Sequence, residues 1–179
     1  MAYLLDTNVF LQAKNLHYGF DFCPAFWDWL KQANTNRLVF SIEKVRDELV
    51  DDDAAQWANG HGDDFFLKPD AKLPASLATV SQWVMAQNYE LAAVNTFLQV
   101  ADYYLVAHAL AHGLDVVTHE VPANSPRKIK IPNVCIGLGL KCMTPFEMLQ
   151  GARASCCDGW LSRLVRFGSV RPHPTPPSS

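Results

Sequence analysis

Short apolar runs alternate along the chain with longer stretches in which apolar residues recur at steps of three and four positions. The short runs predict β-strands at residues 3–5, 38–40, 115–117 and 131–136. The longer stretches predict helices at residues 22–33, 41–49, 54–58, 77–85, 90–98, 100–112 and 143–149. This alternation of strand and helix is typical of an α/β domain with a parallel sheet.

Residues that begin or end helices mark three of these boundaries. Ser41 is expected as the N-cap of the helix after the second strand, because its hydroxyl can accept a hydrogen bond from a free backbone N–H group. Gly113 is expected to end the helix of residues 100–112. Thr144, Pro145 and Glu147 form a capping-box pattern that predicts the start of the last core helix.

The same pattern predicts how the chain is divided. Residues 1–150 carry the strands and helices and predict a single domain, because 179 residues suffice for one full core but not for two. Residues 151–167 predict a short amphipathic helix. Residues 168–179 are rich in proline and polar side chains, and this composition predicts a disordered tail.

The composition, with 49% hydrophobic and 18% charged residues, is that of a globular protein. The net charge of -3 gives no overall attraction to nucleic acid, so a nucleic-acid partner would require a local basic patch. Arg127, Lys128 and Lys130 form the candidate patch, and a solvated basic turn is an equally good interpretation of them.

Other sequence features narrow the class of protein. No apolar run approaches the roughly 20 residues of a membrane span and no signal-peptide pattern is present, so we expect a cytoplasmic protein with no membrane partner. The five cysteines form no CxxC pattern and indicate neither a disulfide framework nor a zinc module. His108 and His112 have the i, i+4 spacing of zinc ligands, but no third ligand is suggested nearby, so we interpret them as packed or surface histidines.

An acidic residue follows each of two predicted strands. Asp6 comes directly after residues 3–5, and Glu120 comes shortly after residues 115–117. Ligands of a parallel sheet bind outside the carboxyl ends of its strands, so both carboxylates are placed to hold a metal or a phosphate-bearing substrate. For Asp6 a simple cap or turn role is an equally good interpretation, and the following helix can also be capped by Thr7 or by Asn8.

Two more acids lie on predicted helices. Asp102 is in the first turn of the helix of residues 100–112, with Leu105, Val106 and Ala109 on its own face. A carboxylate among apolar neighbours is costly unless a cation or a hydrogen-bond donor meets it. Glu48 flanks the apolar side of the helix that follows the second strand. These two acids complete a set of four that calls for a chemical explanation.

In this order and setting, the acids resemble those of the PIN-domain family, the metal-dependent nucleases that include the VapC-like toxins of bacterial toxin–antitoxin pairs. The matching segments are Leu-Asp-Thr-Asn at residues 5–8, Val-Arg-Asp-Glu-Leu at 45–49, Ala-Asp at 101–102 and Val-Thr-His-Glu at 117–120. Residues 3–8, 131–135 and 144–149 further resemble an uncharacterised bacterial branch of this family.

The resemblance implies a three-layer α/β/α domain around a short parallel sheet, and an endoribonuclease that hydrolyses RNA phosphodiester bonds with Mg²⁺ or Mn²⁺. Carboxylate oxygens are the ligands that these ions prefer, and a bound ion can generate hydroxide from water at neutral pH. The residues expected to hold the metal and to act in catalysis are Asp6, Glu48, Asp102 and Glu120.

Further expectations follow from the same resemblance. Asn8 and Thr118 would hydrogen-bond to the carboxylates and orient them, and the basic cluster at residues 127–130 would meet the RNA backbone. The expected partners are the RNA substrate and a cognate antitoxin protein, and a second copy of the chain, forming a homodimer, is a further candidate. Glu120 stands where the family usually has Asp, and its extra methylene puts in doubt the position of any second metal.

Two other classes compete with the nuclease. Phosphohydrolases of the haloacid-dehalogenase type also begin with a strand and an aspartate, but they need a DxD pattern, and residue 8 is Asn. The stronger alternative is a catalytically weak PIN-like binding module that keeps the acids and acts through an antitoxin or another protein. Fold-level analogy alone does not decide between these alternatives.

Overall fold

The computed structural model describes residues 2–13, 24–50 and 52–152. The chain divides into two compact units, Met1–Pro145 and Phe146–Ser179. In the second unit, residues 146–152 are helical. The helix expected at residues 151–167 lies almost entirely outside the described residues, as does the tail expected at residues 168–179.

The first unit is organised around a five-stranded parallel sheet with the order β3-β2-β1-β4-β5. Its strands are β1 (Tyr3–Leu5), β2 (Val39–Ile42), β3 (Phe66–Leu67), β4 (Asp115–Val117) and β5 (Cys142–Met143). Residues of β2 and β4 are buried throughout, as expected for parallel strands that are covered on both faces.

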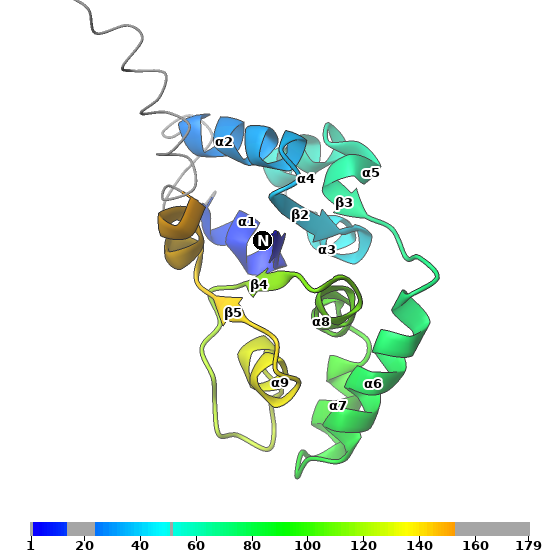
Figure 1. Ribbon diagram of the computed structural model, residues 1–179. Coiled ribbons are helices and arrows are strands. Elements are labelled where there is room, and N and C mark those ends of the chain that lie inside the picture. The colour runs from blue at the N-terminus through cyan, green and yellow to red at the C-terminus, as the bar shows by residue number, and fades with distance from the viewer. Residues whose placement is uncertain (1, 14–23, 51, 153–179) are drawn as a thin grey trace, which may run out of the picture. The chain divides into compact units, whose positions relative to one another are not determined.

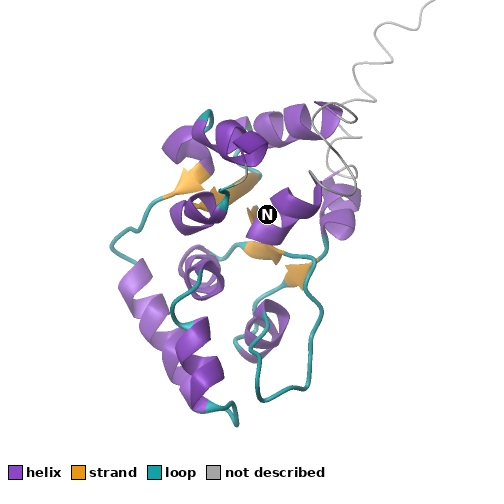
Figure 2. Cartoon of the chain, turned by 180° about the vertical axis from the view of Figure 1, so that it is seen from behind, coloured by secondary structure: helices purple, strands orange, loops and turns teal. Residues whose placement is uncertain are grey.

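Helices cover both faces of the sheet, so the predicted three-layer α/β/α class is confirmed. In Figure 1 the α2 helix lies on one side of the strands and α8 and α9 on the other, and Figure 2 shows the same layers from behind. The helices are α1 (Thr7–Gln12), α2 (Pro24–Thr35), α3 (Glu43–Glu48), α4 (Asp52–Asn59), α5 (Gly62–Phe65), α6 (Leu73–Met85), α7 (Leu91–Phe97), α8 (Ala101–His112) and α9 (Ile131–Gly137).

The strand order reverses direction at β1. The chain runs from β1 outward through β2 to β3, and it returns to β4 on the opposite side of β1. The register pairs Leu4 with Phe40 in β2 and Leu5 with Val117 in β4. Connections therefore leave in opposite directions at the carboxyl ends of β1 and β4, which is the position where open α/β sheets bind ligands.

Helix α8 is the main buried helix of the first unit. Leu105, Val106 and Ala109 are fully buried, and the helix packs against β2, β4 and α6. The Tyr103 hydroxyl donates a hydrogen bond of 2.9 Å to the Leu77 carbonyl oxygen of α6. The sequence correctly predicted the end of this helix at Gly113, whose φ of 64° is the left-handed conformation that glycine adopts without strain.

Two predictions about individual segments are wrong. Residues 131–136 form most of helix α9 instead of a strand, because Pro132 is tolerated in a first helical turn and the helix start is capped from a distant residue. Ser41 lies inside β2 and is fully buried, with its hydroxyl donating a hydrogen bond of 2.8 Å to the Leu5 carbonyl oxygen. Helix α3 has Ile42 at its N-cap position instead.

The connection between α4 and α6 is ordered. It contains α5 and β3, neither of which is among the elements predicted from the sequence. Four aromatic rings explain this order, since the Trp57 ring lies 5.0 Å from Trp27, 5.3 Å from Phe65 and 5.7 Å from Phe10. None of the described helices combines the length and apolar character needed to cross a membrane.

Candidate functional site

Asp6 lies at the carboxyl end of β1 and occupies the N-cap position of α1. Its side chain makes no capping hydrogen bond and is only 1% exposed. Thr118 Oγ1 donates a hydrogen bond of 2.7 Å to Asp6 Oδ2, and Asn8 Nδ2 donates one of 3.1 Å to the same oxygen. Both residues that the resemblance assigned to orienting the carboxylates therefore contact Asp6.

Burial sets the electrostatics of Asp6. Desolvation raises the pKa of its carboxyl to about 6, against the lowering effect of the hydrogen bonds from Thr118 and Asn8. The charge of Glu120 adds to the increase. Near neutral pH the Asp6 carboxylate is thus charged at a considerable energetic cost, and a nearby cation would reduce that cost.

Glu48 ends α3 and connects two other elements. Its Oε2 accepts a hydrogen bond of 2.7 Å from the Thr7 hydroxyl, and its Oε1 accepts one of 3.1 Å from the Ala101 backbone N–H at the start of α8. The sequence offered Thr7 or Asn8 as helix caps, but both side chains bind acids of the cluster instead. Thr7 is a site residue that the sequence analysis missed, although its position directly after Asp6 was a usable signal.

Asp102 lies in the first turn of α8 and is partly buried. Burial raises the pKa of its carboxyl to about 7, and the negative charges of Asp6, Glu120 and Glu48 contribute, in that order. Only the charge of Lys130 opposes them among the main contributions. The fold therefore brings all four acids close enough for their charges to act on one another.

Glu120 lies three residues beyond β4, and its side chain is 11% exposed. Its Oε2 accepts a hydrogen bond of 3.0 Å from the Ile131 backbone N–H at the start of α9. Its Oε1 forms an ion pair with the Lys130 ammonium group. The Glu120 backbone N–H in turn donates to Thr118 Oγ1 over 3.0 Å. Both carboxylate oxygens of Glu120 therefore contact groups of the protein itself.

The basic cluster expected from the sequence is divided between three settings. Arg127 Nε donates to Glu90 Oε1 over 3.2 Å on the protein surface, whereas Lys130 is paired with Glu120. Lys128 is exposed and lines a pocket next to the acids. Lys128 is therefore available to an anionic ligand, whereas Arg127 is paired with Glu90 and Lys130 is paired with Glu120.

The pocket has a volume of about 490 Å³ and lies beside the acids. Residues from α7, the start of α8 and the segment before α9 surround it. Its lining consists of Glu48, Glu90, Ala92, Ala93, Thr96, Phe97, Val100, Asp102, Arg127, Lys128 and Ile129. Sequence analysis did not single out the residues of α7, since their apolar spacing is that of any core helix.

The four carboxylates have the donor chemistry that Mg²⁺ and Mn²⁺ prefer. Both side-chain donors to Asp6 use its Oδ2 atom, and within the described residues no hydrogen bond engages the Asp102 carboxylate. As the side chains stand, no group of three or more His, Cys, Asp or Glu in the described part of the chain is arranged to hold a metal ion. The acids therefore fit a metal in chemistry, and closing around one requires side-chain movement.

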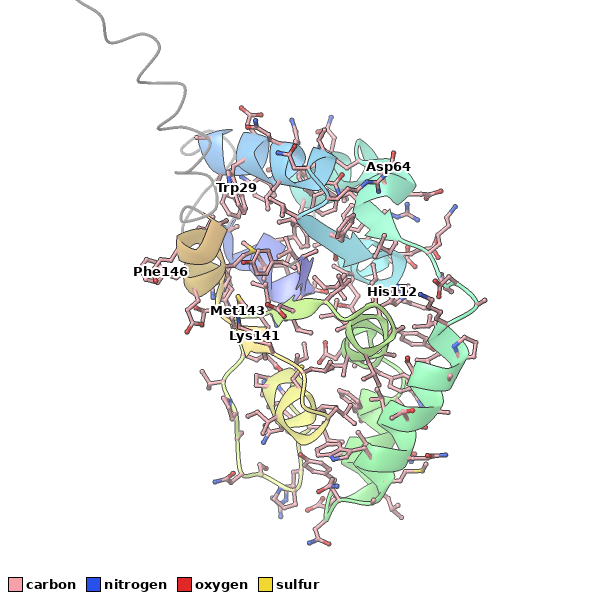
Figure 3. All side chains as sticks on the ribbon, viewed as in Figure 1. Trp29, Asp64, His112, Lys141, Met143 and Phe146 are labelled. Atoms are coloured by element: carbon pink, nitrogen blue, oxygen red, sulfur yellow. The ribbon has the colours of Figure 1, made fainter. Side chains whose placement is uncertain are left out.

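The two histidines of α8 lie apart from the acids. His108 is 2% exposed. His112, which is labelled in Figure 3, has its Nε2 atom 3.4 Å from Oδ2 of Asp70 in the loop before α6. Burial lowers the pKa of His108 to about 4, so this imidazole is neutral at physiological pH. The interpretation of both as packed or surface histidines agrees with these positions.

Comparison with known proteins adds a family but no activity. No curated protein and no solved structure matches the chain. A family model matches residues 3–156, a range that contains all four acids and the whole sheet. The chain belongs to the family described as Domain of unknown function (DUF4411).

Proposed function

We propose that this protein is a metal-dependent endoribonuclease of the PIN type that acts in the cytoplasm as the toxin of a bacterial toxin–antitoxin pair. The observation that carries the proposal is the approach of four acids from four separate segments of the fold, where burial and the neighbouring negative charges raise the pKa of Asp102 to about 7. Side chains with strongly shifted pKa values cluster at functional sites.

The electrostatics favour a cation at this site. Like charges in a partly buried group repel, and without a cation some of the carboxyls take up protons near neutral pH. Lys130 lies nearby, but it is already paired with Glu120. A divalent ion with a preference for oxygen ligands would stabilise the charged forms of Asp6 and Asp102 together.

Each residue would have a defined role. Asp6, Glu48 and Asp102 would hold Mg²⁺ or Mn²⁺, with Glu120 binding directly or through a water molecule. A bound metal supplies hydroxide at neutral pH and stabilises negative charge on the phosphate. Thr118 keeps the Asp6 carboxylate in one orientation through its hydrogen bond of 2.7 Å. Thr7 does the same for Glu48, also over 2.7 Å.

An RNA strand suits the charges around these acids. The whole chain has a net charge of -3, so attraction of a polyanion must be local. Arg127 and Lys128 line the pocket that Asp102 and Glu48 also line. Phosphates held by these two side chains would lie next to the metal ligands. The adjoining basic and acidic side chains therefore suit a phosphodiester backbone.

The test is the substitution Asp102→Asn, which removes one charge while keeping the size and most of the hydrogen bonding of the side chain. We expect Mn²⁺-dependent cleavage of a mixed RNA pool to fall by orders of magnitude, and Mn²⁺ binding measured by calorimetry to weaken. Asp47→Asn is the matched control, because Asp47 is exposed on α3 directly beside Glu48. Cleavage by Asp102→Asn at the parent rate would overturn the proposal.

One observation favours the second candidate, a catalytically weak PIN-like binding module. Glu48 and Glu120 both hydrogen-bond to backbone N–H groups at helix starts, which is a structural role. Expression in a bacterial host separates the candidates. The toxin should slow growth, a co-encoded antitoxin should relieve the effect, and Asp102→Asn should abolish it. A binding module should act equally well with Asp102→Asn.

A further inference from the structure

We propose that the pocket beside the acids is a nucleotide subsite that holds one base and its phosphate from a single-stranded RNA, next to the bond that is cut. This inference rests on the proposed nuclease function and names the feature that selects its substrate. The pocket volume of about 490 Å³ lies within the range of roughly 300–1,000 Å³ of pockets that bind small molecules. Both the volume and the lining support this occupant.

Part of the pocket lining is apolar. It is formed by Ala93, Phe97, Val100 and Ile129. The Phe97 ring also packs edge-on against Tyr103, with centroids 6.1 Å apart and planes at 64°. This apolar lining suits a nucleobase, which can be held by apolar contact without sequence-specific hydrogen bonds.

Arg127 and Lys128 form the cationic rim of the pocket. Both side chains are exposed there and bring positive charge to a region otherwise dominated by carboxylates. The rim is tied to α7, because the Glu90 backbone N–H donates to the Pro126 carbonyl oxygen over 2.9 Å and the Glu90 carboxylate pairs with Arg127. A phosphate would find both cations on a segment whose position is already fixed.

The pocket lining includes two of the proposed metal ligands. Glu48 and Asp102 line the pocket and also belong to the group of four acids. A nucleotide held in this pocket, with its phosphate at Lys128, would thus have a neighbouring phosphodiester close to the acids. A duplex cannot present a base in this way, so the pocket selects unpaired RNA.

Two substitutions of exposed α7 residues test this placement. Ala92→Trp fills the pocket from a lining position, and Asn95→Trp places the same side chain at an exposed position of the same helix outside the lining. Binding of a fluorescein-labelled six-nucleotide RNA is measured by anisotropy without added metal, so that no cleavage occurs. We expect Ala92→Trp to weaken binding by about tenfold or more and Asn95→Trp to leave it within about twofold.

A second pair of variants tests the cationic rim without adding bulk. Lys128→Ala should weaken binding and lower the salt dependence by about one phosphate contact, a slope change of about 0.7 for single strands. Lys72→Ala is the control, because this exposed lysine lies outside the pocket lining. Melting temperatures of all four variants confirm that the fold is retained. This pair keeps the inference testable if Ala92→Trp proves unstable.

The outcomes separate this inference from the nuclease proposal. Selective loss of binding in Ala92→Trp and Lys128→Ala supports the subsite, even for a parent protein that cuts no RNA with Mn²⁺. Metal-dependent cleavage with equal binding in Ala92→Trp and Asn95→Trp overturns the subsite and leaves the nuclease intact. The subsite is also overturned if duplex RNA binds as tightly as the six-nucleotide strand.

Discussion

Thr118 donates a hydrogen bond of 2.7 Å to Asp6 across 112 positions of sequence. Two features of the fold produce this contact. The register between β1 and β4 pairs Leu5 with Val117, the last residues of the two strands. Asp6 and Thr118, which follow them directly, therefore lie at the same edge of the sheet. Thr118 also accepts a hydrogen bond of 3.0 Å from the Glu120 backbone N–H, which fixes the direction of its hydroxyl. One side chain thereby connects two of the four acids.

Replacing Thr118 by Val should separate orientation of Asp6 from packing. Val keeps the shape of the buried side chain but removes the hydroxyl. We expect Mn²⁺ affinity and RNA cleavage to fall by roughly 10–100-fold, as for other residues that orient metal ligands. Calorimetry and cleavage assays measure the two effects. Thr118→Ser retains the hydroxyl and should retain most of the activity. Equal activity of the Val and Ser variants would contradict the assigned role.

The acids should make the metal-free protein lose stability as the pH rises. The pKa of Asp102 is about 7 in the folded chain and close to 3.8 in the unfolded chain, so the folded state binds more protons in between. Stability therefore falls between about pH 4 and pH 7. Asp102→Asn should flatten this decline and raise the free energy of unfolding at pH 8 by about 1–3 kcal/mol. Urea denaturation in EDTA at several pH values measures it, and an unchanged pH profile would refute the charge cluster.

Glu120 should prove more structural than Asp102. Its length lets it reach both the Ile131 backbone N–H and Lys130, and Asp is one methylene shorter. Glu120→Asp should lose the cap of α9 and cost about 0.5–2 kcal/mol of stability. Glu120→Gln retains an oxygen acceptor and should be more stable than Glu120→Asp. Denaturation curves rank the variants, and an Asp variant as stable as the parent would show that the cap contributes little.

His108 should limit stability in acid. Burial and the nearby His112 hold the pKa of His108 at about 4, below the unfolded value of 6.5. The unfolded chain thus binds more protons, and stability is lost as the pH falls from about 6.5 towards 4. The His108 Nδ1 atom also has no hydrogen-bond partner among the described residues. His108→Leu should therefore stabilise the protein by about 1–2 kcal/mol at pH 5 and by less at pH 8. Melting temperatures at both pH values test this, and an equal shift at the two would refute it.

Gly137 should not tolerate a side chain. A Cβ atom there would lie 1.9 Å from Trp83 Cζ2, so the indole of α6 would have to move. Gly137→Ala should destabilise the protein by about 1–3 kcal/mol, and Trp83→Leu should relieve most of that cost in the double variant. Gly62→Ala is the control, because nothing lies within 4 Å of its Cβ position. Additive effects of the two substitutions would contradict the contact.

The sequence by itself determined the elements whose signal is local. The strands at β1, β2 and β4 follow from short apolar runs between helical patterns, and the end of α8 follows from a glycine that can adopt a left-handed conformation. The order of a strand followed by an acid identifies Asp6 and Glu120 as candidate site residues. The alternation of strands and helices was sufficient for the α/β class.

The tertiary structure decided what depends on distant partners. Residues 131–136 could be a strand or a helix by their apolar content, and the Glu120 carboxylate favours the helix by accepting the Ile131 N–H. Thr7 and Asn8 could have been caps, but packing brings Glu48 and Asp6 to them. The pocket beside the acids likewise depends on how α7 and residues 127–129 approach each other. The spacing of apolar residues along the sequence indicates which face of a segment is buried. Only the tertiary structure determines which polar groups come into contact when that face is packed.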